Sequence, residues 1–294
     1  MDLPDRVLEH LRQVIGQPDL TGTRYELGEL IGRGGMGAVY RARDTVLDRE
    51  VALKVLDGGA AVVTASAEAR LLARLEHPSI VAVHEAGELP DGRAFFAMRK
   101  VEGDRLDAFL RAGPVLAARL SVFEKLCEAV GFAHSQGVVH RDLKPENIMV
   151  GRWGEVIVLD WGVALETGSA EPGVVVGTSR YMAPEQRSGG EVDGRADVYA
   201  LGVLLEDLLL AGPPGRALRA IAAKARADRR EDRYASAEAL RRDVERFRDR
   251  LPVEAYAERP WEKALRFADR NRVLLLLVGS YVVVRVALFF LRPR

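Results

Sequence analysis

The stretch VVHRDLKPENIMV, residues 138–150, places five polar side chains between two apolar runs. Short apolar runs are typical of buried strands, so the polar residues between them belong to a loop held against a core. Asp142 is suited to orient a hydroxyl and accept its proton, and Lys144 to contact a phosphoryl group. Asn147 offers a neutral oxygen ligand for a hard cation such as Mg²⁺. The stretch therefore indicates a site that handles phosphate and metal.

A second carboxylate also lies next to an apolar run. The segment VIVLDWG, residues 156–162, is an apolar strand that ends in Asp160 and continues into Gly162. A carboxylate at a strand end close to Asn147 would complete a metal site. Each feature alone also occurs as a turn aspartate or a helix cap, and only their combination favours one site.

A glycine-rich segment, IGRGGMGAVY, lies near the N-terminus and contains Gly32, Gly34 and Gly37 in the spacing G-x-G-x-x-G. Dinucleotide-binding folds share this spacing, but they require a helix directly after the glycines. Here the strand-like AVYRAR follows instead. We predict a hairpin tip whose backbone N–H groups approach phosphate oxygens.

Lys54, within the strand-like segment VALKVL, shares a strand face with Ala52. A lysine on a buried strand face is costly unless an anionic group meets it. Glu68 lies on one helical face with Leu72 and Leu75, which directs its carboxylate inward as a candidate partner. The alternative is that Glu68 is merely exposed at the start of that helix.

The chain divides into a strand-rich half and a helix-rich half, which predicts an α+β fold of two lobes with a crevice between them. Strand patterns run from Tyr25 to about Met98, interrupted by a helix over about 65–75. The helices expected after Leu106 cover 116–135, 197–210, 217–227 and 236–250. Residues 1–23 are expected to form a short helix and a linker.

The C-terminal stretch 273–291, VLLLLVGSYVVVRVALFFL, has one charged residue, Arg285. Its length of about 28 Å as a helix is close to a bilayer core, which favours a transmembrane helix over a buried C-terminal helix. The preceding segment, 252–272, is basic, so we expect the main body on the cytoplasmic side of a cytoplasmic membrane in a single-pass protein. Gly279 and Ser280 permit close approach of two helices, which leaves a homodimer open.

The composition of the chain narrows the possible partners and the cellular setting. The 294 residues carry equal numbers of basic and acidic side chains, which argues against a nucleic-acid partner. Cys127 is the only cysteine and falls on an apolar helical face, so we interpret it as core filling in a reduced, cytosolic setting. The N-terminus has no apolar stretch like that of a secretory signal.

Residues 24–251 resemble eukaryotic-type protein kinases, close to the bacterial serine/threonine kinases. The matching segments are GRGGMGAVY, VALKVL, HRDLKPENIMV, DWG in place of DFG, GTSRYMAPEQ and DVYALG. The resemblance implies a strand-rich N-lobe over about 24–98, a helical C-lobe over about 102–251, and ATP in the cleft between them. It implies an enzyme that transfers the ATP γ-phosphate to protein Ser or Thr hydroxyls, and the apolar C-terminal stretch adds the expectation of membrane-anchored signalling.

The same resemblance implies roles for single residues. Asp142 is the catalytic aspartate, Lys144 contacts the γ-phosphate, and Asn147 and Asp160 bind Mg²⁺ or Mn²⁺. Lys54 holds the ATP phosphates and pairs with Glu68. The residues that the resemblance places around the rest of ATP are Ile31, Gly32, Gly34, Gly37, Val39, Ala52, Met98 and Met149.

Further residues match supporting positions of the family. Glu185 and Arg233 match a structural ion pair, and Asp197 matches a buried anchor of the catalytic loop. In the activation loop, Thr178 resembles a threonine that steadies the catalytic loop. Thr167 and Ser169 are candidate phosphorylation sites that Arg141 would meet once modified.

Two departures and two alternatives accompany the resemblance. Trp161 replaces a phenylalanine, and its larger ring is expected to pack on Leu72. After Leu210, some 25–30 residues of related kinases, including a helix that helps dock substrates, have no counterpart. The alternatives are a pseudokinase scaffold and a small-molecule phosphotransferase of related fold.

Overall fold

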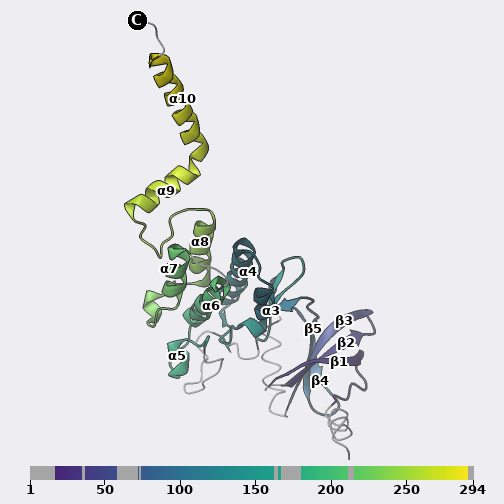
Figure 1. The fold of residues 1–294 in the computed structure, drawn as a ribbon. Coiled ribbons are helices and arrows are strands. Elements are labelled where there is room, and N and C mark those ends of the chain that lie inside the picture. The colour runs from purple at the N-terminus through teal and green to yellow at the C-terminus, as the bar shows by residue number, and fades with distance from the viewer. Residues whose placement is uncertain are drawn as a thin grey trace, which may run out of the picture.

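The computed structural model describes residues 17–34, 37–57, 72, 74–161, 165–166, 180–210 and 215–290. A strand-rich lobe stands beside a helical lobe, and two further helices extend beyond the helical lobe toward the C-terminus (Figure 1). The predicted two-lobed α+β architecture is confirmed. The expected helix within residues 1–23 lies outside the described residues.

The N-lobe is an antiparallel sheet with the strand order β1-β2-β3-β5-β4. Its strands are β1 (Tyr25–Gly34), β2 (Gly37–Asp44), β3 (Arg49–Leu56), β4 (Val83–Glu88) and β5 (Ala94–Arg99). Alternate side chains of β2 and β3 fill a small core that includes Tyr40, Val51 and Leu53. Of the helix expected over 65–75, the structure describes Leu72 and Arg74, which are helical, and Leu75, which is not.

The C-lobe is built around α4 (Leu116–Ser135) and α6 (Gly194–Leu209), whose apolar side chains form the largest core of the molecule. The other helices of this lobe are α3 (Leu106–Arg111), α5 (Pro184–Arg187), α7 (Arg216–Ala225) and α8 (Ala237–Arg248). Helix α6 begins three residues before the predicted start. Asp193 explains the difference, because its side chain accepts a hydrogen bond from the backbone N–H of Arg195 and so caps the helix.

Short strands support the loop between β7 (Val138–Val139) and β8 (Ile148–Val150). Strand β8 pairs with β9 (Val156–Val158) and with β6 (Asp104–Arg105), whereas β7 pairs with β10 (Leu165–Glu166). Val158 also exchanges backbone hydrogen bonds with the segment 79–81, which leads into the N-lobe strand β4. The sheet of β6, β8 and β9 therefore lies at the junction of the two lobes.

Beyond the C-lobe, α9 (Pro260–Arg270) is followed by α10 (Arg272–Phe290), which projects away from both lobes (Figure 1). Among the described residues, no helix is long and apolar enough to cross a membrane. The prediction of a helix here is confirmed, whereas the predicted membrane span over 273–291 is not found.

Candidate active site

The two apolar runs that flank the loop at 140–147 are strands β7 and β8, as the sequence predicts. Both strands are almost completely buried, so they fix the two ends of a polar loop against the C-lobe core. The backbone N–H of Leu159 donates to the carbonyl of Asn147 at 2.8 Å and thereby joins the loop to the end of β9. This contact brings Asp160 beside the loop.

Asp142, Lys144 and Asn147 converge within the loop. Lys144 Nζ lies 2.6 Å from Asp142 Oδ2. The side-chain amide of Asn147 donates to the backbone carbonyl of Asp142 at 2.9 Å and to its Oδ2 at 3.3 Å. Since its nitrogen is engaged by Asp142, the amide oxygen of Asn147 is the atom available to a cation.

Lys54 and Asp160 form an ion pair between the two lobes. Lys54 Nζ on β3 lies 2.9 Å from Asp160 Oδ1, and the lysine side chain is 12% exposed. Burial by itself would raise the pKa of Asp160, but Lys54, with smaller contributions from His140 and Lys144, holds that pKa below its ordinary value. A carboxylate kept charged in this way is suited to cation binding.

Asp160 occupies the left-handed region, with φ of 57°, and Arg141 does so with φ of 69°. Non-glycine residues there carry strain that the surrounding structure must hold.

Trp161 belongs to the same core cluster as Leu72 and is 1% exposed. The centre of its ring lies 4.5 Å from that of His140, and Trp161 Nε1 donates to the carbonyl of Val158 at 3.4 Å. The larger ring is thus accommodated and its N–H finds a partner.

His140 is held by two ring contacts. Its Nδ1 accepts from the backbone N–H of Asp142 at 3.3 Å, and its Nε2 lies 3.0 Å from the carbonyl of Leu159. This pattern requires the proton on Nε2. The ring consequently links the backbone beside Asp142 to the residue before Asp160.

Asp197, at the start of α6, binds the backbone of the loop. Its two carboxylate oxygens accept from the backbone N–H groups of His140 at 2.8 Å and Arg141 at 2.9 Å. His134 Nε2 lies 2.8 Å from Oδ2 of the same carboxylate. Burial works to raise the pKa of Asp197, and its contacts with His134 and His140 outweigh burial, leaving the pKa below its ordinary value. Asp197 is therefore a buried anion that three donors satisfy.

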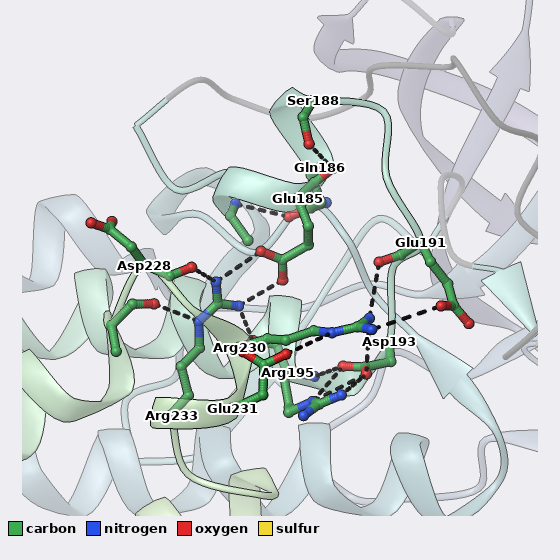
Figure 2. Close-up of polar contacts among 12 residues, drawn as sticks. Glu185, Gln186, Ser188, Glu191, Asp193, Arg195, Asp228, Arg230, Glu231 and Arg233 are labelled. Atoms are coloured by element: carbon green, nitrogen blue, oxygen red, sulfur yellow. Dashed lines mark hydrogen bonds and ion pairs between the residues drawn. The ribbon is translucent and has the colours of Figure 1, made fainter.

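A second support comes from the segment around α5. The side-chain amide of Gln186 donates to the carbonyl of Arg141 at 2.9 Å. Arg233 makes a two-pronged ion pair with Glu185, at 2.6 and 2.8 Å, and donates its remaining N–H groups to three backbone carbonyls (Figure 2). The neighbouring Arg230 lies toward Asp193. The predicted Glu185–Arg233 pair is present.

The glycine-rich segment forms the predicted hairpin. Gly34 on β1 pairs with Gly37 on β2, and a Cβ atom on Gly37 would lie 2.1 Å from the carbonyl oxygen of Val55. Gly37 also has φ of 142°, so this position tolerates only glycine. Val39 lies in register with Lys54, which places the hairpin directly beside the lysine.

The other side chains predicted around ATP lie on strands close to this hairpin. Ala52 is in register with Met98 on β5, whereas Met149 pairs with Arg105 on the C-lobe side. Ile31 and Gly32 lie on β1, where Ile31 is 51% exposed. Strand pairing therefore connects these positions from β1 to β5, with Met149 on the other lobe.

Some predicted residues lie outside the part of the chain that the structure describes. They are Glu68, Gly162, Thr167, Ser169 and Thr178. The predicted Lys54–Glu68 pair and the activation-loop positions stay predictions.

Sequence reasoning missed His134 and Gln186. A signal for His134 was present, because it continues the apolar helical face of Phe123, Cys127 and Val130 at the spacing i, i+4, i+7, i+11. A polar ring on such a face needs a buried partner, which here is Asp197. Gln186 carried no comparable signal, since its partner is a backbone carbonyl 45 residues away in sequence.

The arrangement combines a carboxylate that can accept a proton with two amines that can bind anionic oxygens. In the part of the chain that the structure covers, no group of three or more His, Cys, Asp or Glu side chains is arranged to hold a metal ion. Asn147 and Asp160 instead form a pair of oxygen donors, which suits Mg²⁺ when phosphate oxygens and water complete its shell. The chemistry that fits these groups is phosphoryl transfer.

Comparisons with known proteins agree with this chemistry. The serine/threonine-protein kinase PknB of Mycobacterium tuberculosis is 35% identical over 306 aligned residues, which cover 90% of this chain and 48% of the relative. A probable serine/threonine-protein kinase of Streptomyces coelicolor is 39% identical over 217 residues, covering 67% of this chain and 32% of the relative. PknH of Mycobacterium bovis is 41% identical over 203 residues, covering 66% of this chain and 34% of the relative.

The chain thus spans about half the length, or less, of these curated relatives. The family model described as protein kinase domain matches residues 25–259, which is most of the sequence. That match includes both lobes, the glycine hairpin and the loop around Asp142. The chain belongs to the protein kinase domain family and is homologous to bacterial serine/threonine kinases.

Proposed function

We propose that this chain is a serine/threonine protein kinase that transfers the γ-phosphoryl group of ATP to hydroxyl groups of protein substrates. The observation that carries the proposal is the convergence of Asp142, Lys144 and Asn147 beside the Lys54–Asp160 pair. Membership of the protein kinase domain family implies the use of ATP.

The residues divide the work by their chemistry. Asp142 orients the acceptor hydroxyl and accepts its proton as the oxygen attacks the γ-phosphorus. Lys144, 2.6 Å from that carboxylate, is placed to bind an oxygen of the transferring group. Lys54 binds the phosphates that remain on the nucleotide. Electrostatic stabilisation and positioning supply most of the catalysis in such transfers.

Asn147 and Asp160 would hold the divalent cation, Mg²⁺ or Mn²⁺, which supplies charge neutralisation of the phosphates. The amide of Asn147 is oriented by its contacts with Asp142, and Asp160 is kept ionised by Lys54. Both residues therefore present oxygen atoms without a change of protonation.

The test is transfer of label from γ-labelled ATP to a generic basic protein, with Mg²⁺ present. Asp142→Asn is expected to lower the rate by several orders of magnitude while Asp249→Asn, an exposed substitution of the same kind on the C-lobe, leaves it unchanged. No transfer by the unmodified chain would indicate a pseudokinase scaffold. Transfer to sugars or aminoglycosides but not to protein would indicate a small-molecule phosphotransferase.

Regulation by phosphorylation is part of the proposal. Burial lowers the pKa of Arg141, and its Nε is buried with no hydrogen-bond partner among the described residues. A phosphate on Thr167 or Ser169 would supply an acceptor for this guanidinium. Mass spectrometry of the active enzyme tests this, because full activity with neither residue modified contradicts it.

We also propose attachment to the cytoplasmic membrane, with the kinase lobes in the ATP-containing compartment. The support is the exposure of apolar side chains along α10, among them Leu276 at 71% and Val283 at 67%. Contiguous exposed apolar surface of this kind is typical of a membrane or protein contact. Co-sedimentation of the full chain with lipid vesicles, lost when α10 is deleted, is the expected result.

A further inference from the structure

Helix α9 is tied to the C-lobe along one side. Glu262 accepts hydrogen bonds from Tyr256 Oη at 2.9 Å and from the backbone N–H of Arg259 at 2.9 Å, and its Oε1 lies 3.4 Å from an Arg216 nitrogen on α7. Tyr256 in turn packs against the main core of the lobe. The first turn of α9 therefore has a set orientation relative to the kinase lobes.

The segment that leads into α9 is also bound to the C-lobe. The buried carboxylate of Asp243 on α8 accepts from Tyr234 Oη at 2.6 Å and from the backbone N–H groups of Glu254 and Ala255. Val253 is 7% exposed and belongs to the core cluster of the C-lobe. These contacts make the passage from α8 to α9 a part of the folded lobe.

The outer side of α9 carries apolar side chains that are largely exposed. Trp261 is 55% exposed and Phe267 is 62% exposed. Ala264 and Ala268 follow Trp261 at the spacing i+3 and i+7, so they lie on the same helical face. Two exposed aromatic rings on one short helix are characteristic of the interface between a bilayer and water.

Basic side chains accompany this apolar face. Arg259 lies over the ring of Trp261, with 5.1 Å from Cζ to the ring centre, and Lys263 is exposed on α9. The sequence adds Arg266, Arg270 and Arg272 within or next to the helix, against two acidic residues, Glu262 and Asp269. Glu262 already faces the kinase lobe. The net positive charge is therefore complementary to anionic lipid headgroups.

We propose that α9 lies flat at the surface of an anionic phospholipid bilayer, with Trp261 and Phe267 among the headgroups and the basic side chains on lipid phosphates. The inference rests on the membrane attachment proposed above and adds the lipid class and the orientation of the lobes. Helix α9 is followed directly by α10, whose apolar side chains are also exposed, and this proximity in sequence favours lipid over a protein partner. Because α9 is tied to the C-lobe, its binding would hold the active site at a set height and angle above the membrane.

The experiment follows the fluorescence of the full-length chain as vesicles are added. A Trp153→Phe background removes the 91% exposed tryptophan of the β8–β9 turn, and Trp161 is buried, so a change in emission reports Trp261. Vesicles of phosphatidylcholine with phosphatidylglycerol are expected to shift the emission to shorter wavelength. Brominated lipid is expected to quench it. Adding Trp261→Phe is expected to abolish both effects.

The second part of the experiment reverses the charge of one basic side chain on α9. Lys263→Glu is expected to lower partitioning onto the anionic vesicles roughly tenfold and to leave partitioning onto pure phosphatidylcholine unchanged. Arg229→Glu, the same kind of reversal at an exposed C-lobe position, is the matched control and is expected to have no effect.

Four outcomes overturn the inference. Co-sedimentation without a change in Trp261 emission means that α10 attaches alone, which preserves membrane attachment and refutes the role of α9. Equal binding of the Lys263→Glu variant refutes the headgroup contact. A shift in emission that grows with protein concentration without vesicles means that a second copy covers the face. Loss of all vesicle binding refutes the attachment itself.

Discussion

The Arg233 side chain is completely buried, and each of its N–H groups has an acceptor in Glu185 or in a backbone carbonyl. Arg233→Ala would leave the Glu185 carboxylate without its main partner, so we expect it to lower the free energy of unfolding by about 3–5 kcal/mol. Chemical denaturation measures the change. Arg229→Ala, whose side chain is 77% exposed, is the control, with an expected change within about 0.5 kcal/mol.

Asp197 makes the fold sensitive to acid. The pKa of Asp197 is lower in the folded state than its ordinary value of 3.8. At any pH above 3.8 its ionised form therefore stabilises the fold, and this stabilisation is lost as the pH falls through the lower pKa of the folded state. We expect Asp197→Asn to reduce stability at neutral pH, and the difference from the unmodified chain to narrow below about pH 4. Denaturation curves recorded across pH 3–7 check this. A constant difference over that range would contradict it.

At the scale of elements, the packing of α4 against α8 encloses Cys127. The thiol is fully buried, and burial raises its pKa well above the ordinary value. Since the thiolate is the reactive form, we expect Cys127 to react with a thiol reagent at neutral pH only after these helices separate. One equivalent of reagent consumed in denaturant, and almost none in buffer, is the expected result. Rapid reaction of the native chain would show that α4 opens locally.

The junction of α6 and α7 is the place where the sequence predicts a missing segment relative to the resembling kinases. Tyr181 Oη donates to Asp207 at 2.8 Å, and α7 begins at Arg216, so only a short segment follows α6. By the resemblance, the helix that helps dock substrates in related kinases is expected to have no counterpart in this interval. We therefore expect substrate choice to depend on other surfaces or on colocalisation. Grafting that helix from a relative should change substrate preference, and an unchanged preference and rate would make its loss irrelevant.

At the scale of the whole molecule, Lys54 and Asp160 join the two lobes across the candidate nucleotide site. ATP with Mg²⁺ at about 100 times its Kd should stabilise the fold by about 2.7 kcal/mol and raise Tm by roughly 5–10 °C. Lys54→Met is expected to remove most of this shift because it removes the charge that meets the phosphates. Thermal unfolding with and without nucleotide measures it. Lys263→Met, on the exposed side of α9, should retain the full shift.

Local patterns in the sequence were sufficient for the elements and for the chemistry of the loop. Apolar runs on either side of Asp142, an alternating strand around Lys54 and helical spacing around Cys127 all correspond to the elements observed. Such patterns are local because strand and helix periods depend on neighbouring residues. They also predicted residue types that suit phosphate and metal binding.

Tertiary structure alone decided how these parts meet. The pairing of Lys54 with Asp160 joins residues 106 apart, and Asp197 binds the backbone of a loop 56 residues before it. No periodic pattern encodes such contacts, because they depend on how two lobes and several helices pack. The apolar stretch near the C-terminus shows the same limit of local patterns. Its hydropathy predicted a membrane span, yet among the described residues no helix is long and apolar enough to cross a membrane. The position of α9 against the C-lobe comes instead from distant partners of Glu262 and Asp243.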